Sequence, residues 1–141
     1  MANREYTLLI VDDDDLILTT LELAFTGLNY RIITCNDPIK AYQIVENQHV
    51  DLAILDVVMP QMDGFELLEK IKNFNGMIQV IMLTGEISIY NALKAFRKGA
   101  TDIFFKPLES NESLLQAVAE ATARVERVNG FLRKIIDKRG G

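Results

Sequence analysis

Three aspartates, one threonine and one lysine stand where apolar runs of the sequence end. Asp12 and Asp13 follow the run 6–11, Asp56 ends the run 51–56, Thr84 ends the run 78–84, and Lys106 follows the run 101–105. Three carboxylates gathered in one cleft repel one another and raise one another's pKa unless a cation neutralises them. The set therefore indicates a site for a hard divalent ion, with Mg²⁺ as the first candidate, because this ion binds oxygen ligands and keeps water positions open for a phosphoryl group.

Asp56 is the best candidate for the reacting group. Four apolar residues precede it, and Pro60 and the pair Asp63-Gly64 turn the chain directly after it. This pattern places a carboxylate at the carboxyl end of a buried strand, where open α/β sheets bind their ligands. An aspartate that attacks a phosphoryl group forms a mixed anhydride, an aspartyl phosphate. Lys106 would supply a positive charge to the transferring group, and Thr84 a hydroxyl donor.

The elements that position these residues alternate along the chain. Strand-like runs are expected at 6–11, 31–35, 51–56, 78–84 and 101–105, each followed by a helical pattern. Within them Phe65, Phe74, Phe96 and Met82 keep helix or strand spacing and are predicted to lie in the core, whereas His49 is predicted to lie at the surface without a partner. Such an alternation predicts an α/β domain, a doubly wound parallel sheet of five strands with right-handed crossovers.

Composition excludes several classes of protein. The chain of 141 residues is 49% hydrophobic, carries a formal charge of -5, and has a sequence pI near 4.9. An acidic domain is a poor candidate for binding nucleic acid, and no apolar run is long enough for a membrane span. A single cysteine and the lack of a signal-peptide pattern at the amino terminus favour the cytoplasm.

The motifs together resemble the receiver domain of bacterial two-component response regulators. They are 8–13, ending in Asp12-Asp13; 51–64, ending in Met59-Pro60-Gln61-Met62-Asp63-Gly64; 80–84; and 99–107, which contains Lys106-Pro107. The resemblance covers about Tyr6 to Val125. It implies the strand order 2-1-3-4-5 of the flavodoxin-like fold.

The resemblance also implies a function and a partner. Asp56 would accept a phosphoryl group from a sensor histidine kinase or a histidine phosphotransfer protein, and Mg²⁺ would be held by Asp12, Asp13, Asp56 and the backbone carbonyl of Val58. A domain of this kind is a signalling phosphoacceptor that switches conformation to regulate a partner or an output domain, and it is not an enzyme acting on other substrates. The Lys106-Pro107 bond is expected to be cis.

The carboxy-terminal helix is the less usual part. Its apolar residues step by four and three, which is the spacing of a coiled coil: Leu114, Val118, Ala121, Val125, Val128, Leu132 and Ile135. We therefore divide the chain into a receiver domain, 1–124, and a helical extension, 125–141. The extension is predicted to form a short coiled coil in a homodimer or to link to an output module. A frayed helix end is the plainer alternative, because Gly130 interrupts the pattern.

Two other functions fit parts of the pattern. A phosphohydrolase similar to the haloacid dehalogenases would use Asp12 as its nucleophile, with Asp14 two residues later. That alternative leaves Asp56 and its loop unexplained, and no acidic pair follows Lys106. A structural module with an unused pocket is the other alternative, and the complete set of site residues argues against it.

Overall fold

A single parallel sheet organises the chain. The computed structural model describes residues 4–140, so the predictions for the first three residues and for Gly141 lie outside the described residues. The strands are β1 (Tyr6–Val11), β2 (Tyr30–Cys35), β3 (Leu52–Asp56), β4 (Gln79–Thr84) and β5 (Asp102–Phe105). All neighbouring pairs are parallel, and the order is β2-β1-β3-β4-β5. The predicted fold class and strand order are confirmed.

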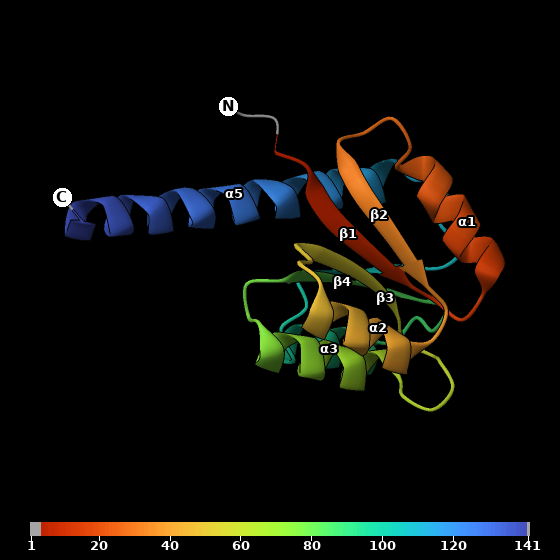
Figure 1. Ribbon diagram of the computed structural model, residues 1–141. Helices are drawn as coiled ribbons and strands as arrows, with labels where there is room; N and C mark the ends of the chain where they lie inside the picture. The colour runs from red at the N-terminus through yellow and green to blue at the C-terminus, as the bar shows by residue number, and fades with distance from the viewer. Residues whose placement is uncertain (1–3, 141) are drawn as a thin grey trace.

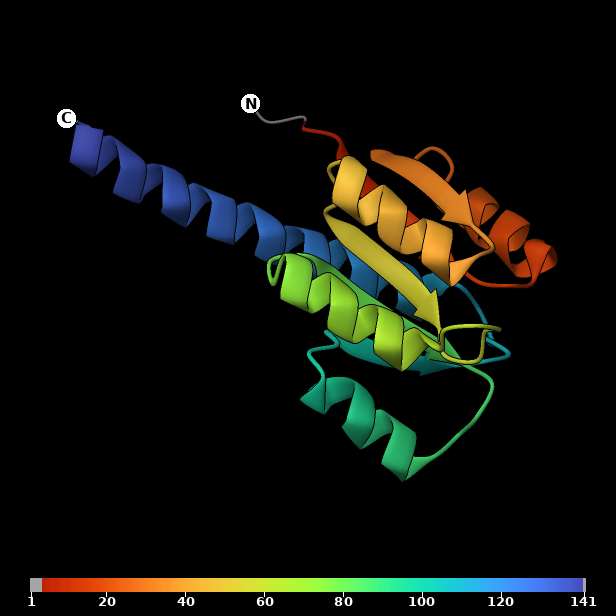
Figure 2. The same ribbon diagram turned by 60° about the horizontal axis from the view of Figure 1, so that its bottom comes forward.

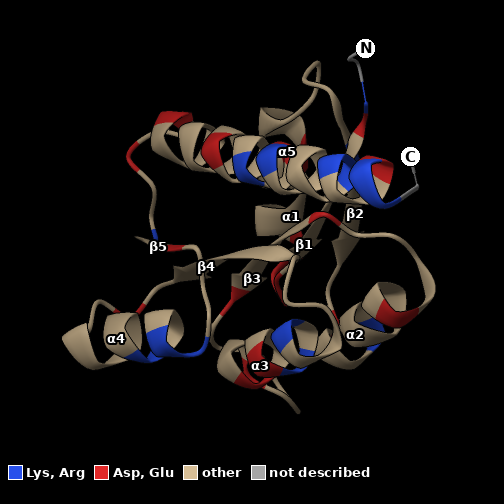
Figure 3. Cartoon of the chain, turned by 90° about the vertical axis from the view of Figure 1, so that its left-hand side faces the viewer, with Lys and Arg blue, Asp and Glu red and all other residues tan. Residues whose placement is uncertain are grey.

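Helices cover both faces of this sheet (Figure 1). They are α1 (Asp15–Ala24), α2 (Pro38–Asn47), α3 (Gly64–Phe74), α4 (Ile89–Arg97) and α5 (Glu112–Gly140). The views in Figures 2 and 3 show α1 and α5 on one face and α2, α3 and α4 on the other. None of these helices combines the length and the apolar character that crossing a membrane requires, within the part of the chain that is described.

The alternation of side chains along the strands builds two separate cores. In β1, Leu9 and Val11 pack with α2 and α3, whereas Leu8 and Ile10 pack with α1 and α5. The strand is buried throughout, as a strand covered on both faces must be. Burial on both faces is the reason that the central strands β1, β3 and β4 are nearly continuous apolar runs and that the polar residues at their carboxyl ends stand out.

Polar side chains begin the first four helices. The carboxylate of Asp14 accepts a hydrogen bond from the amide of Leu16 at 2.9 Å, and that of Asp37 accepts one from Ile39 at 2.8 Å. Asp63 accepts from Glu66 at 2.9 Å, and the hydroxyl of Ser88 accepts from Asn91 at 3.2 Å. Asp63 is therefore the N-cap of α3 as well as a turn residue. Each cap satisfies an amide that the helix leaves unpaired, and so each fixes where a helix leaves the edge of the sheet that carries the candidate site.

Two predictions that a residue lies in the core are wrong. Phe74 and Phe96 are 49% and 48% exposed, so they are not in the core, while Phe65 and Met82 are buried as predicted. Phe74 is the last residue of α3 and lies edge-on to the ring of Tyr42, and Phe96 lies on the outer side of α4 next to the buried Ala95.

His49 lies exposed at the surface, as predicted, but the prediction that it has no partner is wrong. Its Nε2 lies 2.8 Å from Oδ1 of Asp51 and 3.1 Å from Nη2 of Arg4. Asp51 is buried and also accepts a hydrogen bond from the amide of Thr7 at 2.9 Å. The cluster ties the amino terminus to the start of β3, at the edge of the sheet opposite the candidate site.

Helix α5 continues well past the sheet (Figures 1 and 2). Its first half is buried through Leu114, Val118, Ala121 and Val125, and Tyr30 and Thr122 share a hydrogen bond of 2.9 Å between their hydroxyls. Phe131 and Ile136, farther along, are 64% and 66% exposed. The division at 124/125 and the homodimer both stay predictions.

Candidate functional site

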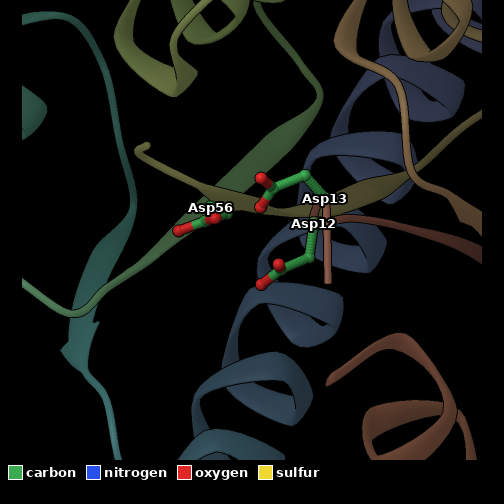
Figure 4. A group of neighbouring side chains, drawn as sticks. All are labelled: Asp12, Asp13 and Asp56. Carbon is green, nitrogen blue, oxygen red and sulfur yellow. The ribbon is translucent and has the colours of Figure 1, made fainter. Parts of the chain in front are cut away.

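The carboxylates of Asp12, Asp13 and Asp56 meet at the carboxyl edge of the sheet. One oxygen from each lies within 4.8 Å of the others, and Figure 4 shows the three side chains turned toward a common space. Asp12 and Asp13 directly follow β1, and Asp56 ends β3, which pairs with β1. Asp12 and Asp56 are buried and Asp13 is exposed, so the group opens to solvent on one side. The sequence placed all three residues at this edge.

Lys106 joins the cluster from the end of β5. Its Nζ lies 2.7 Å from Oδ2 of Asp12 and 3.3 Å from Oδ1 of Asp56. Burial alone would lower the pKa of Lys106, but the hydrogen bond and the charge of Asp12, with the charge of Asp56, raise the pKa above its ordinary value. The ammonium therefore stays charged and holds two of the three carboxylates. The Lys106-Pro107 bond is cis, as expected.

Thr84 ends β4 beside the cluster. Its side chain is fully buried, and its Oγ1 accepts a hydrogen bond from the amide of Glu86 at 3.1 Å. The amide of Lys106 donates to the carbonyl of Thr84 at 2.8 Å, which ties the ends of β4 and β5 together. Glu86 in turn accepts a hydrogen bond from the side chain of Asn91 at 3.2 Å, so the loop after Thr84 is tied to α4.

Val58 is the one predicted site residue whose part in the site rests on its backbone. Its side chain is 59% exposed, in the loop that follows β3. The amide of Gly64 donates to the carbonyl of Val57 at 2.7 Å, which closes this loop onto the end of the strand. A Cβ on Gly64 would lie 2.1 Å from the carbonyl oxygen of Asp56. The sequence pattern identifies Gly64 only as a turn residue, and its close approach to the backbone of Asp56 is visible only in the fold.

The electrostatics of the cluster favour a cation. One ammonium faces three carboxylates, which leaves an excess of negative charge in a partly buried space. Burial, and then the charge of Asp12, raise the pKa of Asp56 to about 6 from its ordinary value of 3.8, although Lys106 acts in the opposite direction. Oxygen ligands with surplus negative charge and an open side are the donor set that a hard divalent cation requires.

A measurement of stability tests whether the excess negative charge of the carboxylate cluster destabilises the fold. Because the pKa of Asp56 is raised in the folded protein, the folded state binds its proton more tightly than the unfolded chain, and ionisation destabilises the fold as the pH rises through 6. We expect Asp56→Asn to raise the free energy of unfolding by about 1 to 3 kcal/mol at pH 7.5 without divalent cations, and to bring no gain at pH 4. Urea unfolding with a chelator at both pH values measures this difference. A variant less stable than the wild type at pH 7.5 would contradict it.

Comparison with known proteins places the chain in a family. The family model described as the response regulator receiver domain matches residues 8–119. The chain belongs to this family. It is a receiver domain of the two-component response regulators, a signalling domain, and the resemblance inferred from its motifs is confirmed.

Relatives of the receiver domain include transcriptional regulators. The chain is 35% identical over 123 residues to the transcriptional regulatory protein ZraR of Klebsiella oxytoca, a match that covers 87% of this chain and 28% of ZraR. It is 34% identical over 125 residues to the response regulator GtcR of Aneurinibacillus migulanus, covering 89% of this chain and 50% of GtcR. The chain thus spans half or less of the length of these two relatives.

Solved structures show the same fold. A CheY-like response regulator receiver domain protein from Methanospirillum hungatei JF-1 superposes with a TM-score of 0.83 at 29% identity, covering 88% of this chain and 98% of that one. The alternative of a haloacid dehalogenase-like phosphohydrolase finds no support in these comparisons.

Proposed function

We propose that Asp56 accepts a phosphoryl group from a sensor histidine kinase or a histidine phosphotransfer protein, in a reaction that depends on Mg²⁺. The observation that carries the proposal is the contact of one ammonium, that of Lys106, with the carboxylates of both Asp12 and Asp56 at the open edge of the sheet. The domain then acts as a signalling phosphoacceptor, whose only chemistry is its own phosphorylation and dephosphorylation.

In the transfer, an oxygen of Asp56 attacks the phosphorus atom and the bond from phosphorus to the donor breaks. The donor leaves with the bonding electron pair, and Asp56 becomes an acyl phosphate. Lys106 lies 3.3 Å from the attacking carboxylate, where its charge can neutralise the incoming phosphoryl oxygens. The hydroxyl of Thr84, which accepts a hydrogen bond from the amide of Glu86, would donate its own hydrogen to a phosphoryl oxygen, which couples the chemistry to the loop that leads to α4.

The donor set fits Mg²⁺. Asp12, Asp13 and Asp56 would hold the ion, with the backbone carbonyl of Val58 as a further oxygen ligand. The ion would supply neutralisation of charge on the transferring group. Since Asp12 also bonds Lys106, one side chain would link the ion to the ammonium and fix their separation.

The donor protein would approach beside α1. A largely apolar cavity of 390 Å³ lies there, lined by residues that include Ile17, Thr20, Leu108 and Lys106 itself. Leu16, on the first turn of the same helix, is 72% exposed. Because Lys106 both lines this cavity and contacts Asp56, a donor that places an apolar side chain in the cavity brings its phosphorylated histidine next to the acceptor.

Labelling with a small phosphodonor tests the proposal. We expect acetyl phosphate and Mg²⁺ to add one phosphoryl group, stable in acid and labile in base as an acyl phosphate is, and detected as an intact-mass shift. Chelating the ion should slow labelling on the order of a hundredfold. Base-stable labelling, or labelling that does not respond to the chelator, would overturn the assignment.

A further inference from the structure

A second hollow lies between α3 and α4, away from the carboxylate cluster. It has a volume of 660 Å³ and is open to solvent. Its lining residues are Glu69 and Asn73 from α3, and Tyr90, Lys94, Arg97 and Lys98 from α4 and its end. We call it the α3–α4 groove. Figure 3 shows the two helices on the same face of the sheet, with basic segments on α4.

The α3–α4 groove is positive on a protein that is negative overall. Three of its lining side chains are cationic, and among the described lining residues Glu69 is the one carboxylate, in a chain of net charge -5. Glu69 forms an ion pair with Lys98, and the pKa of Glu69 is lowered by the hydrogen bond from Lys98. This pairing leaves the charges of Lys94 and Arg97 for a ligand.

Aromatic rings stand beside one of these two cations, Lys94. The ammonium of Lys94 lies 4.7 Å from the ring centre of Phe65 and 5.8 Å from that of Tyr90, so the two rings hold it in place. Tyr90 is 69% exposed, and its ring offers an apolar surface at the mouth of the groove. A ligand with carboxylates and an apolar side chain would match the cations and the ring together.

We propose that the α3–α4 groove binds an acidic segment of a partner protein in an extended conformation. A helix of nine residues such as α4 is about 14 Å long, which about four extended residues span at roughly 3.3 Å each. The lining residues are side chains from two helices, and an extended peptide can place alternate side chains onto such a shallow surface. Carboxylates of the peptide bind Lys94 and Arg97, and an apolar residue packs on Tyr90.

The position of the groove links it to the candidate site. Helix α3 begins at the loop that follows Asp56, where the amide of Gly64 bonds the carbonyl of Val57. Helix α4 begins at the loop that follows Thr84, which the bond from Asn91 to Glu86 ties down. A change at either strand end shifts a wall of the groove, so peptide binding is coupled to the labelling of Asp56. This coupling rests on the proposed function, whereas binding itself does not.

The test uses a fluorescein-labelled peptide of eight residues, with glutamates on both sides of a central phenylalanine, and follows its fluorescence anisotropy on titration with the whole protein. The same peptide with lysines in place of the glutamates is the ligand control. We expect the acidic peptide alone to bind, and Arg97→Glu to weaken it at least about fivefold. Lys40→Glu is the matched variant, since Lys40 is exposed on α2 and the net charge changes equally; it should bind as the wild type does.

Glu69→Gln is expected to change the affinity for the acidic peptide in the opposite direction to Arg97→Glu. It removes the carboxylate from the groove and frees Lys98, so we expect the acidic peptide to bind about two- to fivefold more tightly. A merely structural role for the Glu69–Lys98 pair would produce no gain. Absence of binding by the wild type, equal losses in Arg97→Glu and Lys40→Glu, or no gain in Glu69→Gln would each overturn the proposal.

Measuring peptide affinity before and after labelling with acetyl phosphate and Mg²⁺ tests the groove and the acceptor site independently. An affinity that changes about threefold or more on labelling supports the coupling, and an unchanged affinity in fully labelled protein refutes it. Arg97→Glu should still be labelled at the wild-type rate. Labelling without peptide binding therefore refutes only the groove, and peptide binding without labelling refutes only the function proposed for Asp56.

Discussion

Asp56→Asn is expected to abolish labelling by acetyl phosphate. The amide nitrogen and oxygen of asparagine carry no charge with which to attack phosphorus, so the acyl phosphate cannot form. Asp12 and Asp13 remain in the variant, so the variant tests whether Asp56 is the acceptor among the three carboxylates. We expect the labelled fraction to fall below about one hundredth of that of the wild type, measured by intact mass under conditions in which the wild type is fully labelled.

The matched control for this prediction is Asp37→Asn. Asp37 is partly exposed just before α2, at the same edge of the sheet, and its carboxylate caps the helix. Asparagine caps as well as aspartate does, so the fold is kept and one negative charge is removed. Labelling of Asp37→Asn should equal that of the wild type. If Asp56→Asn were still labelled, another residue would be the acceptor, and the role proposed for Asp56 would be wrong.

The sequence predicted the site because of how the fold buries its strands. β1 and β3 are covered on both faces and are apolar until they reach the edge of the sheet, so Asp12 and Asp56 each mark a strand end in the sequence. Lys106 follows the apolar residues of the edge strand β5 in the same way. Once the strands are parallel, those ends must share one edge. The pattern of strand ends therefore predicts that residues far apart in the sequence lie together. Asp12 and Lys106, 94 positions apart, form a hydrogen bond of 2.7 Å.

Other features of the structure depend on tertiary contacts, which the periodicity of apolar residues in the sequence does not predict. Phe74 and Phe96 keep the spacing of core residues, yet both are about half exposed. Phe74 is the last residue of α3, and α4 buries Ala95 rather than its neighbour Phe96. The partners of His49 include Arg4, which lies 45 positions earlier. The α3–α4 groove likewise comes from the packing of two helices, and the sequence shows only that Lys94, Arg97 and Lys98 share one helix or its end.

The site and the groove share the two loops that follow β3 and β4. The loop from Asp56 to Gly64 is held by the bond from the Gly64 amide to the carbonyl of Val57. The loop from Thr84 to α4 is held by Glu86, whose amide bonds the hydroxyl of Thr84 and whose carboxylate bonds the side chain of Asn91. A phosphoryl group that draws the hydroxyl of Thr84 toward Asp56 would break one of these bonds. The loop after β4 is therefore the element that we expect to respond first.

Gly64→Ala is expected to destabilise the protein strongly. The added Cβ would lie 2.1 Å from the carbonyl oxygen and 2.9 Å from the carbonyl carbon of Asp56, and a backbone cannot give way as the end of a flexible side chain can. Relief requires the first turn of α3 to move away from the end of β3, which breaks the 2.7 Å bond from the Gly64 amide to Val57. We expect the free energy of unfolding to fall by about 3 kcal/mol or more, measured by urea denaturation.

Gly85→Ala is the control, because a Cβ on Gly85 would meet no atom within 4 Å and the residue has no positive φ. It should leave stability unchanged or raise it by up to about 1 kcal/mol, since alanine restricts the unfolded chain. The same displacement in Gly64→Ala moves Asp56 relative to Lys106, so labelling by acetyl phosphate should slow about a hundredfold in the fraction that stays folded. Equal stability of the two variants would show that α3 can shift without strain, and that the close approach of Gly64 to Asp56 does not hold the acceptor in place.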